Sequence, residues 1–188
     1  MSRFPTHTID SAPAAAKPLL EAAKKAYSFI PNLFGGMAEA PALLEGYMAL
    51  AGIFGKTNLS ETERQIILLT NNRLNGCTYC MAAHTTISQG AGVPADVIEA
   101  LRTGASIANP KLEALRVFSV VMNESRGWPT QGQVEALLAA GYTRQTVLEV
   151  ILGTSLKVMS NYINHIAATP LDEAFKPNAW SPAMAKAA

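Results

Sequence analysis

Charged side chains are scarce in this sequence. Asp, Glu, Lys and Arg together make up 15% of its 188 residues, whereas about 25% is usual in globular proteins. Hydrophobic residues make up 49%, so one folded copy would have few polar groups with which to cover its surface. We therefore expect buried subunit interfaces and a homo-oligomer. The net charge of +1 comes from interspersed signs, and the lack of a basic stripe argues against nucleic acid as a partner.

The sequence also lacks an apolar run long enough to cross a membrane. Its longest apolar stretch, residues 147–168, has four interruptions: Glu149, Lys157, Asn161 and Asn164. A membrane-spanning helix needs about 20 predominantly apolar residues, so we expect no membrane partner. The first ten residues contain no continuous apolar segment of the kind found in secretory signals. These absences predict a cytoplasmic protein.

No segment alternates apolar and polar residues between hairpin turns, as a half-buried strand would. Apolar residues recur instead at helical spacing, which predicts an all-α fold. The predicted helices cover 14–27, 41 to 52 or 55, 61–73, 77 to 88 or 89, 94–101, a stretch from 110, 130–140 and 143–167, with a short candidate at 171–175. Proline and glycine punctuate residues 29–36, where we expect irregular packing.

Helix starts and chain ends suggest the domain organisation. Two capping-box patterns, at residues 60–63 and 130–133, mark the starts of two helices. Residues 1–12 show no periodicity and are predicted to form an extended arm, followed by a single helical domain over 13–176 and a tail over 177–188.

Cysteine occurs only twice, at Cys77 and Cys80. In a cytoplasmic protein, such a close pair is more often redox-active or metal-binding than structural. A structural zinc site usually needs four ligands, and here only the distant His7 and His165 could complete one. We therefore expect no metal and no cofactor, and a redox role for the pair. Buried cysteines that merely pack as small hydrophobes are the alternative.

The stretch from Asn75 to His84, Asn-Gly-Cys-Thr-Tyr-Cys-Met-Ala-Ala-His, places both thiols and a histidine on one helix face. Asn and Gly tolerate left-handed backbone angles, so one helix should end there and the next begin at or near Cys77. The helix dipole would favour a thiolate at Cys77, whereas His84 would favour one at Cys80. A thiol with a pKa of about 8.5 is about 3% ionised at pH 7, and lowering the pKa to about 7 makes it half ionised.

These residues resemble the carboxymuconolactone decarboxylase superfamily, and within it the AhpD-like alkyl hydroperoxidases and peroxidase-related proteins. The matching core is residues 59–92, with the Cys-x-x-Cys-x-x-x-His signature after Asn-Gly. Softer matches lie at 30–34, 140–142, 161–165 and 170–172. The resemblance implies an AhpD-like helical domain that assembles as dimers, trimers or hexamers.

The resemblance also implies a chemistry for the cysteine pair, which is the reduction of hydroperoxides. We therefore expect a thiol-dependent peroxidase or disulfide reductase with an antioxidant role. Cys80 matches the cysteine that becomes a sulfenic acid, Cys77 matches the partner that closes the disulfide, and His84 matches the histidine of the proton relay. The reductants that it implies are dithiols, such as lipoyl groups on carrier proteins. The chemistry is coherent, because a thiolate attacks the peroxide bond and an external dithiol restores the pair.

One position departs from the family pattern. The resemblance implies a relay glutamate twelve residues before the first cysteine, where this chain has Gln65, and an amide cannot exchange a proton at neutral pH. Glu63 is the nearest substitute, although it also matches the N3 carboxylate of the capping box started by Ser60. Tyr79, between the cysteines, and His165, on the long apolar helix, are further candidates for the relay or the pocket.

The sequence leaves two alternative functions. One is a cofactor-free enzyme of the carboxymuconolactone decarboxylase type, which needs no cysteine pair. The other is a non-catalytic helical oligomer with inert cysteines.

Overall fold

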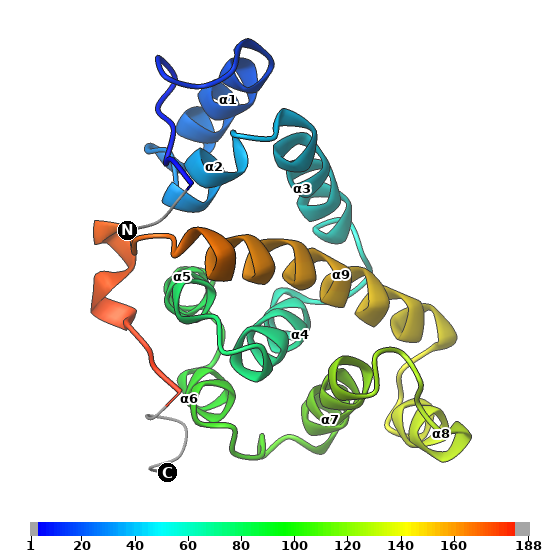
Figure 1. Ribbon diagram of the computed structural model, residues 1–188. Coiled ribbons are helices and arrows are strands. Elements are labelled where there is room, and N and C mark those ends of the chain that lie inside the picture. The colour runs from blue at the N-terminus through cyan, green and yellow to red at the C-terminus, as the bar shows by residue number, and fades with distance from the viewer. Residues whose placement is uncertain (1–3, 183–188) are drawn as a thin grey trace.

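The computed structural model describes residues 4–182 as a set of packed helices, and no strand occurs in this range (Figure 1). The predicted all-α fold is therefore confirmed. The α-helices are α1 (Lys17–Tyr27), α2 (Asn32–Met37), α3 (Pro41–Phe54), α4 (Glu61–Leu74), α5 (Thr78–Gly90), α6 (Ala95–Thr103), α7 (Pro110–Glu124), α8 (Gln131–Ala139) and α9 (Arg144–Ala167), and the 3-10 helices are η1 (Ala14–Ala16) and η2 (Glu173–Asn178). Residues 1–3 of the predicted arm and 183–188 of the predicted tail lie outside the described residues.

The longest helix, α9, runs across the middle of the molecule (Figure 1). Helices α1 to α3 lie on one side of it, and α4 to α8 lie on the other. Helix α4 is central to the second group, because it packs against α5, α6, α7 and α9. Within residues 4–182, no helix is both long and apolar enough to span a membrane.

Helix α4 begins at a predicted capping box and is buried on most of its circumference. Ser60 accepts a hydrogen bond from the backbone N–H of Glu63, and the Glu63 side chain accepts one from the backbone N–H of Ser60. Every residue of α4 from 65 to 72 is buried. Two polar side chains of this buried run, Gln65 and Asn72, reach the residues around the cysteines.

Close packing between α9, α4 and α3 depends on Gly153. A Cβ atom at this position would lie 2.7 Å from Ile67 Cγ2 and 2.9 Å from the Phe54 ring. These distances are well below van der Waals contact, so only glycine permits this approach. The approach brings the inner face of α9 towards the start of α5.

The turn between α4 and α5 places the first cysteine at a helix start. Gly76 has a φ of 67°, in the left-handed region that favours glycine. Cys77 follows as the N-cap of α5, and its backbone N–H donates to the carbonyl of Asn72. The predicted break at Asn75 and Gly76 and the predicted helix start near Cys77 are thus confirmed.

Two segments differ from their predictions. Residues 29–36 were expected to pack irregularly, but they include most of α2, which begins after Pro31. The N-terminal arm packs against this helix at Gly35: the backbone N–H of His7 donates to the carbonyl of Gly35, and an added Cβ there would lie 2.8 Å from the backbone oxygen of His7. Near the C-terminus, the short helix is η2 at 173–178 rather than 171–175. After η2, the buried Trp180 donates its indole N–H to the carbonyl of Arg102.

Candidate functional site

The two cysteines lie together at the N-terminal end of α5. They approach to 3.3 Å, and both are free thiols. Cys77, the N-cap residue, accepts a hydrogen bond from the backbone N–H of Cys80 over 3.4 Å. Cys77 is 1% exposed and Cys80 is 2% exposed, so access to the sulfur atoms depends on a cavity rather than on the outer surface.

A polar stripe on the inner face of α9 faces the sulfur atoms. Four buried residues at helical spacing form this stripe: Lys157, Ser160, Asn161 and Asn164. Asn164 Nδ2 lies 3.2 Å from Cys80 Sγ and 3.7 Å from Cys77 Sγ. Ser160 Oγ lies 3.7 Å from Cys80 Sγ. The sequence analysis did not assign these residues to the site, although polar residues recurring at three and four positions along an apolar helix were a usable signal.

A chain of hydrogen bonds runs from Lys157 to the protein surface. Lys157 Nζ lies 2.8 Å from His84 Nε2, and His84 Nδ1 lies 2.9 Å from Gln65 Oε1. Gln65 Nε2 donates in turn to Glu61 Oε1 over 2.7 Å. Since Gln65 Oε1 is an acceptor, His84 carries its proton on Nδ1 and accepts at Nε2 from Lys157. Gln65 thus fixes the tautomer of His84.

The surroundings give the two thiols opposite acidities. Burial raises the pKa of Cys80, but the hydrogen bond from Cys77 and the charge of Lys157 outweigh burial and lower the pKa to about 6. The hydrogen bond to Cys80 and burial both raise the pKa of Cys77. Cys80 is therefore the thiolate and Cys77 the thiol that donates to it. The dipole of α5, which was expected to favour a thiolate at Cys77, does not decide which of the two thiols is the more acidic.

His84 was expected to favour a thiolate at Cys80, but it is not the source of positive charge at the site. Burial and the charge of Lys157 lower the pKa of His84 well below its usual value. The imidazole is consequently neutral at pH 7 and supplies no positive charge to Cys80. The cation beside Cys80 is Lys157, which the sequence analysis treated only as an interruption of an apolar stretch.

The remaining candidate residues lie at three separate places. Glu63 is bound to Ser60 in the capping box, and it is Gln65 that contacts His84. The buried Tyr79 donates its hydroxyl to Asp172 Oδ2 over 2.5 Å, so it ties α5 to the segment before η2. His165 is exposed in the last turn of α9.

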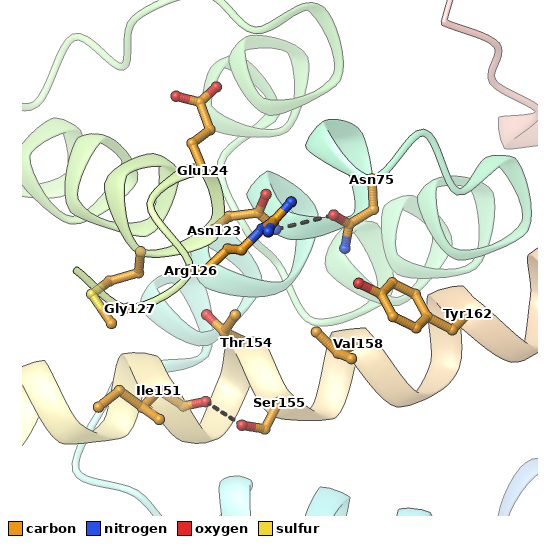
Figure 2. Close-up of a pocket in the computed structure, with 11 residues that line it drawn as sticks. Asn75, Asn123, Glu124, Arg126, Gly127, Ile151, Thr154, Ser155, Val158 and Tyr162 are labelled. Atoms are coloured by element: carbon orange, nitrogen blue, oxygen red, sulfur yellow. Dashed lines mark hydrogen bonds between the residues drawn. The ribbon is translucent and has the colours of Figure 1, made fainter. Parts of the chain in front are cut away.

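Asparagine side chains support the backbone beside Cys80. Asn72 donates to the carbonyl of Cys80 and accepts from Asn161. Asn161 accepts from Asn75, which accepts from Asn123 over 3.1 Å, the bond drawn in Figure 2. This relay of amides fixes the start of α5 relative to α4, α7 and α9, because buried amides are stabilised only when their hydrogen bonds are made.

A cavity of about 470 Å³, termed here the thiol cavity, gives access to Cys80. Its wall is mainly apolar and includes seven of the chain's 13 aromatic residues: Tyr27, Phe29, Phe34, Tyr47, Phe54, Tyr79 and Phe175. Its polar wall includes Cys80, His84, Lys157 and Gln65. An apolar cavity with a few polar groups on its wall is the usual form of a small-molecule site.

A second hollow, of about 570 Å³, opens between α7 and α9 and is shown in Figure 2. Asn75, Asn123, Arg126 and Tyr162 contribute to its wall, which contains neither cysteine nor histidine. Among residues 4–182, no group of three or more His, Cys, Asp or Glu side chains is arranged to hold a metal ion. The thiol cavity is therefore the place in the described structure where nucleophilic side chains gather.

Comparison with solved structures shows a shared fold over nearly the whole chain. An AhpD-core, uncharacterised peroxidase-related protein from Ralstonia eutropha JMP134 superposes with a TM-score of 0.82 at 21% identity, covering 93% of this chain and 94% of that chain. An uncharacterised peroxidase-related protein from Silicibacter sp. TM1040 gives 0.77 at 18% identity, covering 92% and 94%. A cysteine-to-alanine variant of the debrominase Bmp8, in complex with 2,3,4-tribromopyrrole, gives 0.77 at 16% identity, covering 95% and 97%.

Sequence comparison gives a family match over part of the chain. Residues 41–122, which include α4, α5 and both cysteines, match the carboxymuconolactone decarboxylase family. A search of curated protein sequences gives no significant match. The chain therefore has an AhpD-like helical fold, and its residues 41–122 are similar to the carboxymuconolactone decarboxylase family.

Proposed function

We propose that the protein is a thiol-dependent peroxidase that reduces organic hydroperoxides with the Cys77–Cys80 pair. The observation that carries this proposal is the place of Cys80 on the wall of an apolar cavity, with Cys77 3.3 Å away and Lys157 on the same wall, where the charge of Lys157 helps to lower the Cys80 pKa. A thiolate with access to substrate and a neighbouring resolving thiol is what peroxide reduction requires.

The reaction begins when the Cys80 thiolate attacks the terminal oxygen of the hydroperoxide. The O–O bond breaks, Cys80 becomes a sulfenic acid, and the other oxygen leaves as an alkoxide that needs a proton. Cys77 then attacks the sulfenic sulfur, releasing water and closing the disulfide. Asn164 donates towards both sulfur atoms, which orients the pair for this second step. A dithiol, such as a lipoyl group on a carrier protein, reduces the disulfide by thiol exchange.

The aromatic wall of the thiol cavity favours bulky apolar hydroperoxides over hydrogen peroxide, because apolar surface is removed from water when they bind. An antioxidant role in the cytoplasm is part of the same proposal. The expected homo-oligomer would form through the outer face of α9, where exposed apolar residues align at helical spacing: Leu148, Ile151, Tyr162 and Ile166.

The proposed function is tested by peroxide consumption with a small dithiol as donor. We expect Cys80→Ser to abolish turnover of an organic hydroperoxide, since the hydroxyl of serine is not ionised at neutral pH. Cys77→Ser should permit the first step only, so that a reagent specific for sulfenic acids labels Cys80. Lys111→Met, a change beside Tyr142 and outside the thiol cavity, is the control and should keep full turnover.

Unchanged turnover in Cys80→Ser would contradict the proposal. If the wild-type protein consumed no peroxide, and a Cys77→Ser/Cys80→Ser variant kept turnover on an acidic lactone, the decarboxylase-type alternative would replace it. If the folded protein showed neither activity and its thiols were unreactive, the inert helical oligomer would be the better account.

A further inference from the structure

Lys157 is a buried cation whose charge needs an explanation. None of its surface is exposed, and its ammonium nitrogen lies 2.8 Å from His84 Nε2, a neutral acceptor. No carboxylate of residues 4–182 forms an ion pair with it. An isolated ammonium group is costly to bury, and it keeps its proton only when an anion lies nearby. Burial lowers the pKa of Lys157 overall, and the charge of the Cys80 thiolate, the anion available here, opposes that shift.

The same cavity lacks another ready proton donor for a leaving alkoxide. The titratable and charged groups around Lys157 come from four elements: Tyr27 of α1, Tyr47 of α3, Glu61 and Arg64 of α4, and Cys77, Tyr79, Cys80 and His84 of α5. Burial raises the pKa of Tyr47 and Tyr79 above the usual tyrosine range, so both are poor acids. Arg64 donates to the carboxylate of Glu61 and to a backbone carbonyl, so its guanidinium protons are engaged.

Protons from the surface are also blocked on this side of the site. The hydrogen-bonded chain from Glu61 passes through the Gln65 amide before it reaches His84. An amide does not exchange protons at neutral pH, so Glu61 cannot reprotonate His84 by this route. The His84 Nδ1 proton is held by Gln65, and His84 Nε2 is occupied by Lys157. Apart from the Cys77 proton, which is needed for the water formed in the second step, the proton available to the alkoxide on this cavity wall is therefore the one on Lys157.

We propose that Lys157 carries the proton of the redox cycle: its ammonium pairs with the Cys80 thiolate, protonates the departing alkoxide, and stays neutral while the cysteines form a disulfide. His84 is the positioning residue that holds Nζ in place, and Gln65 orients His84. This inference rests on the proposed function for its peroxide step, but the pairing of Lys157 with the thiol couple is testable without peroxide.

The atoms and charges of the cycle balance without a proton from solvent. Thiolate, thiol, ammonium and ROOH become disulfide, neutral amine, ROH and water. The thiolate supplies the electron pair that breaks the O–O bond, the ammonium protonates RO⁻, and the Cys77 proton leaves in the water. On reduction, an external dithiol returns two electrons and two protons, one to Cys77 and one to Lys157, and is itself oxidised to a disulfide.

Proton counting tests the inference on the whole protein. At pH 8 in weak buffer, the reduced wild-type protein is oxidised with one equivalent of cumene hydroperoxide or of diamide, while an indicator dye follows pH and absorbance at 240 nm follows the thiolate. We expect the thiolate signal to disappear with no proton taken up for each disulfide formed. Uptake of one proton for each disulfide, or no thiolate signal before oxidation, would overturn the inference.

Two variants sharpen the measurement. Lys157→Arg keeps a cation that cannot release its proton, so it should keep the thiolate but take up one proton for each disulfide. Lys157→Met removes the cation, and alkylation of Cys80 at pH 7 should fall about thirtyfold if its pKa returns to about 8.5. Lys111→Met should match the wild type in proton uptake, in thiolate absorbance and in the rate of Cys80 alkylation. Lys157→Met with unchanged alkylation would also overturn the inference.

The two oxidants separate this inference from the proposed function. Failure of peroxide to form the disulfide would contradict peroxidase activity, whereas diamide would still report whether Lys157 releases its proton when the pair is oxidised. If either substitution prevents folding, the wild-type proton count decides alone.

Discussion

The two neighbours that lower the pKa of Cys80 most do not include the histidine one turn later. Cys77 donates a hydrogen bond, and Lys157 supplies the positive charge, so that the thiolate is favoured despite burial. His84 acts through Lys157, since its Nε2 accepts from Nζ. The same arrangement keeps Cys77 protonated, because its proton is shared with the neighbouring thiolate.

The pH dependence of Cys80 alkylation follows from this arrangement. Only the thiolate reacts, and the folded pKa lies below that of a free thiol, so the rate should rise with pH around an inflection near 6 and fall about tenfold for each unit below it. Alkylation followed by peptide mass spectrometry measures this profile. A wild-type inflection between about 8 and 9 would show that the thiol is unperturbed.

The hydrogen bond from Cys77 can be separated from the charge of Lys157. Cys77→Ala removes the donor and should move the Cys80 inflection to higher pH. Cys77→Ser keeps a hydroxyl donor at the same position and should move it less. An equal shift in both variants would mean that the hydrogen bond contributes little.

At the scale of helices, local sequence signals predicted where a helix begins better than which segments pack against it. The capping boxes at Ser60 and Thr130 both form, and the Asn75–Gly76 break ends α4 because a left-handed residue is needed there. Helix α2 was missed because proline and glycine punctuate its sequence, and the N-terminal arm that packs against it at Gly35 is not local.

The candidate site was predicted only in part, because some of its residues are close together in sequence and others are far apart. Cys77, Cys80 and His84 lie on one short helix, so their spacing alone brought them together. Lys157 and Asn164 reach the sulfur atoms from 77 and 84 positions away in sequence, counting from Cys80. No periodicity within α9 specifies which helix its polar stripe will face, so their role required the tertiary structure.

Packing of α9 against α4 gives a stability prediction at this scale. Gly153→Ala would place a methyl group 2.7 Å from Ile67 Cγ2, and we expect the overpacked variant to lose about 1–3 kcal/mol of unfolding free energy. Urea unfolding followed by circular dichroism measures the loss. Gly153 also positions the inner face of α9, so the Cys80 alkylation profile should shift in the same variant.

Gly132 in α8 provides the matched control. A Cβ atom added there meets no atom within 4 Å, so Gly132→Ala should stabilise the helix by about 0.5–1 kcal/mol, because alanine has the higher helix propensity. Stabilisation by both substitutions would refute the close approach of α9 to α4.

At the scale of the whole molecule, α9 reverses the usual amphipathic arrangement. Its inner face carries Lys157 to the thiol cavity and Asn164 to the cysteine sulfurs, whereas its outer face exposes Leu148, Tyr162 and Ile166. Polar residues inside belong to the site, and apolar residues outside are typical of a surface that another subunit covers. The low charge content of the chain agrees with this interpretation.

A charge introduced on the outer face of α9 should therefore change the assembly. We expect Tyr162→Glu combined with Ile166→Glu to lower the molar mass measured by light scattering during gel filtration to that of a single chain, because burying two carboxylates in an apolar interface is unfavourable. Ile53→Lys, at an exposed apolar residue of α3, is the control and should leave the mass unchanged. A wild-type protein that is monomeric at all concentrations would refute the proposed interface.

The account as a whole depends on one event, the formation of a Cys77–Cys80 disulfide by peroxide. The direct measurement is intact-protein and peptide mass spectrometry before and after one equivalent of an organic hydroperoxide. We predict the loss of two hydrogens, located between Cys77 and Cys80, with one molecule of alcohol formed for each chain. An unchanged mass with the peroxide intact would contradict the account.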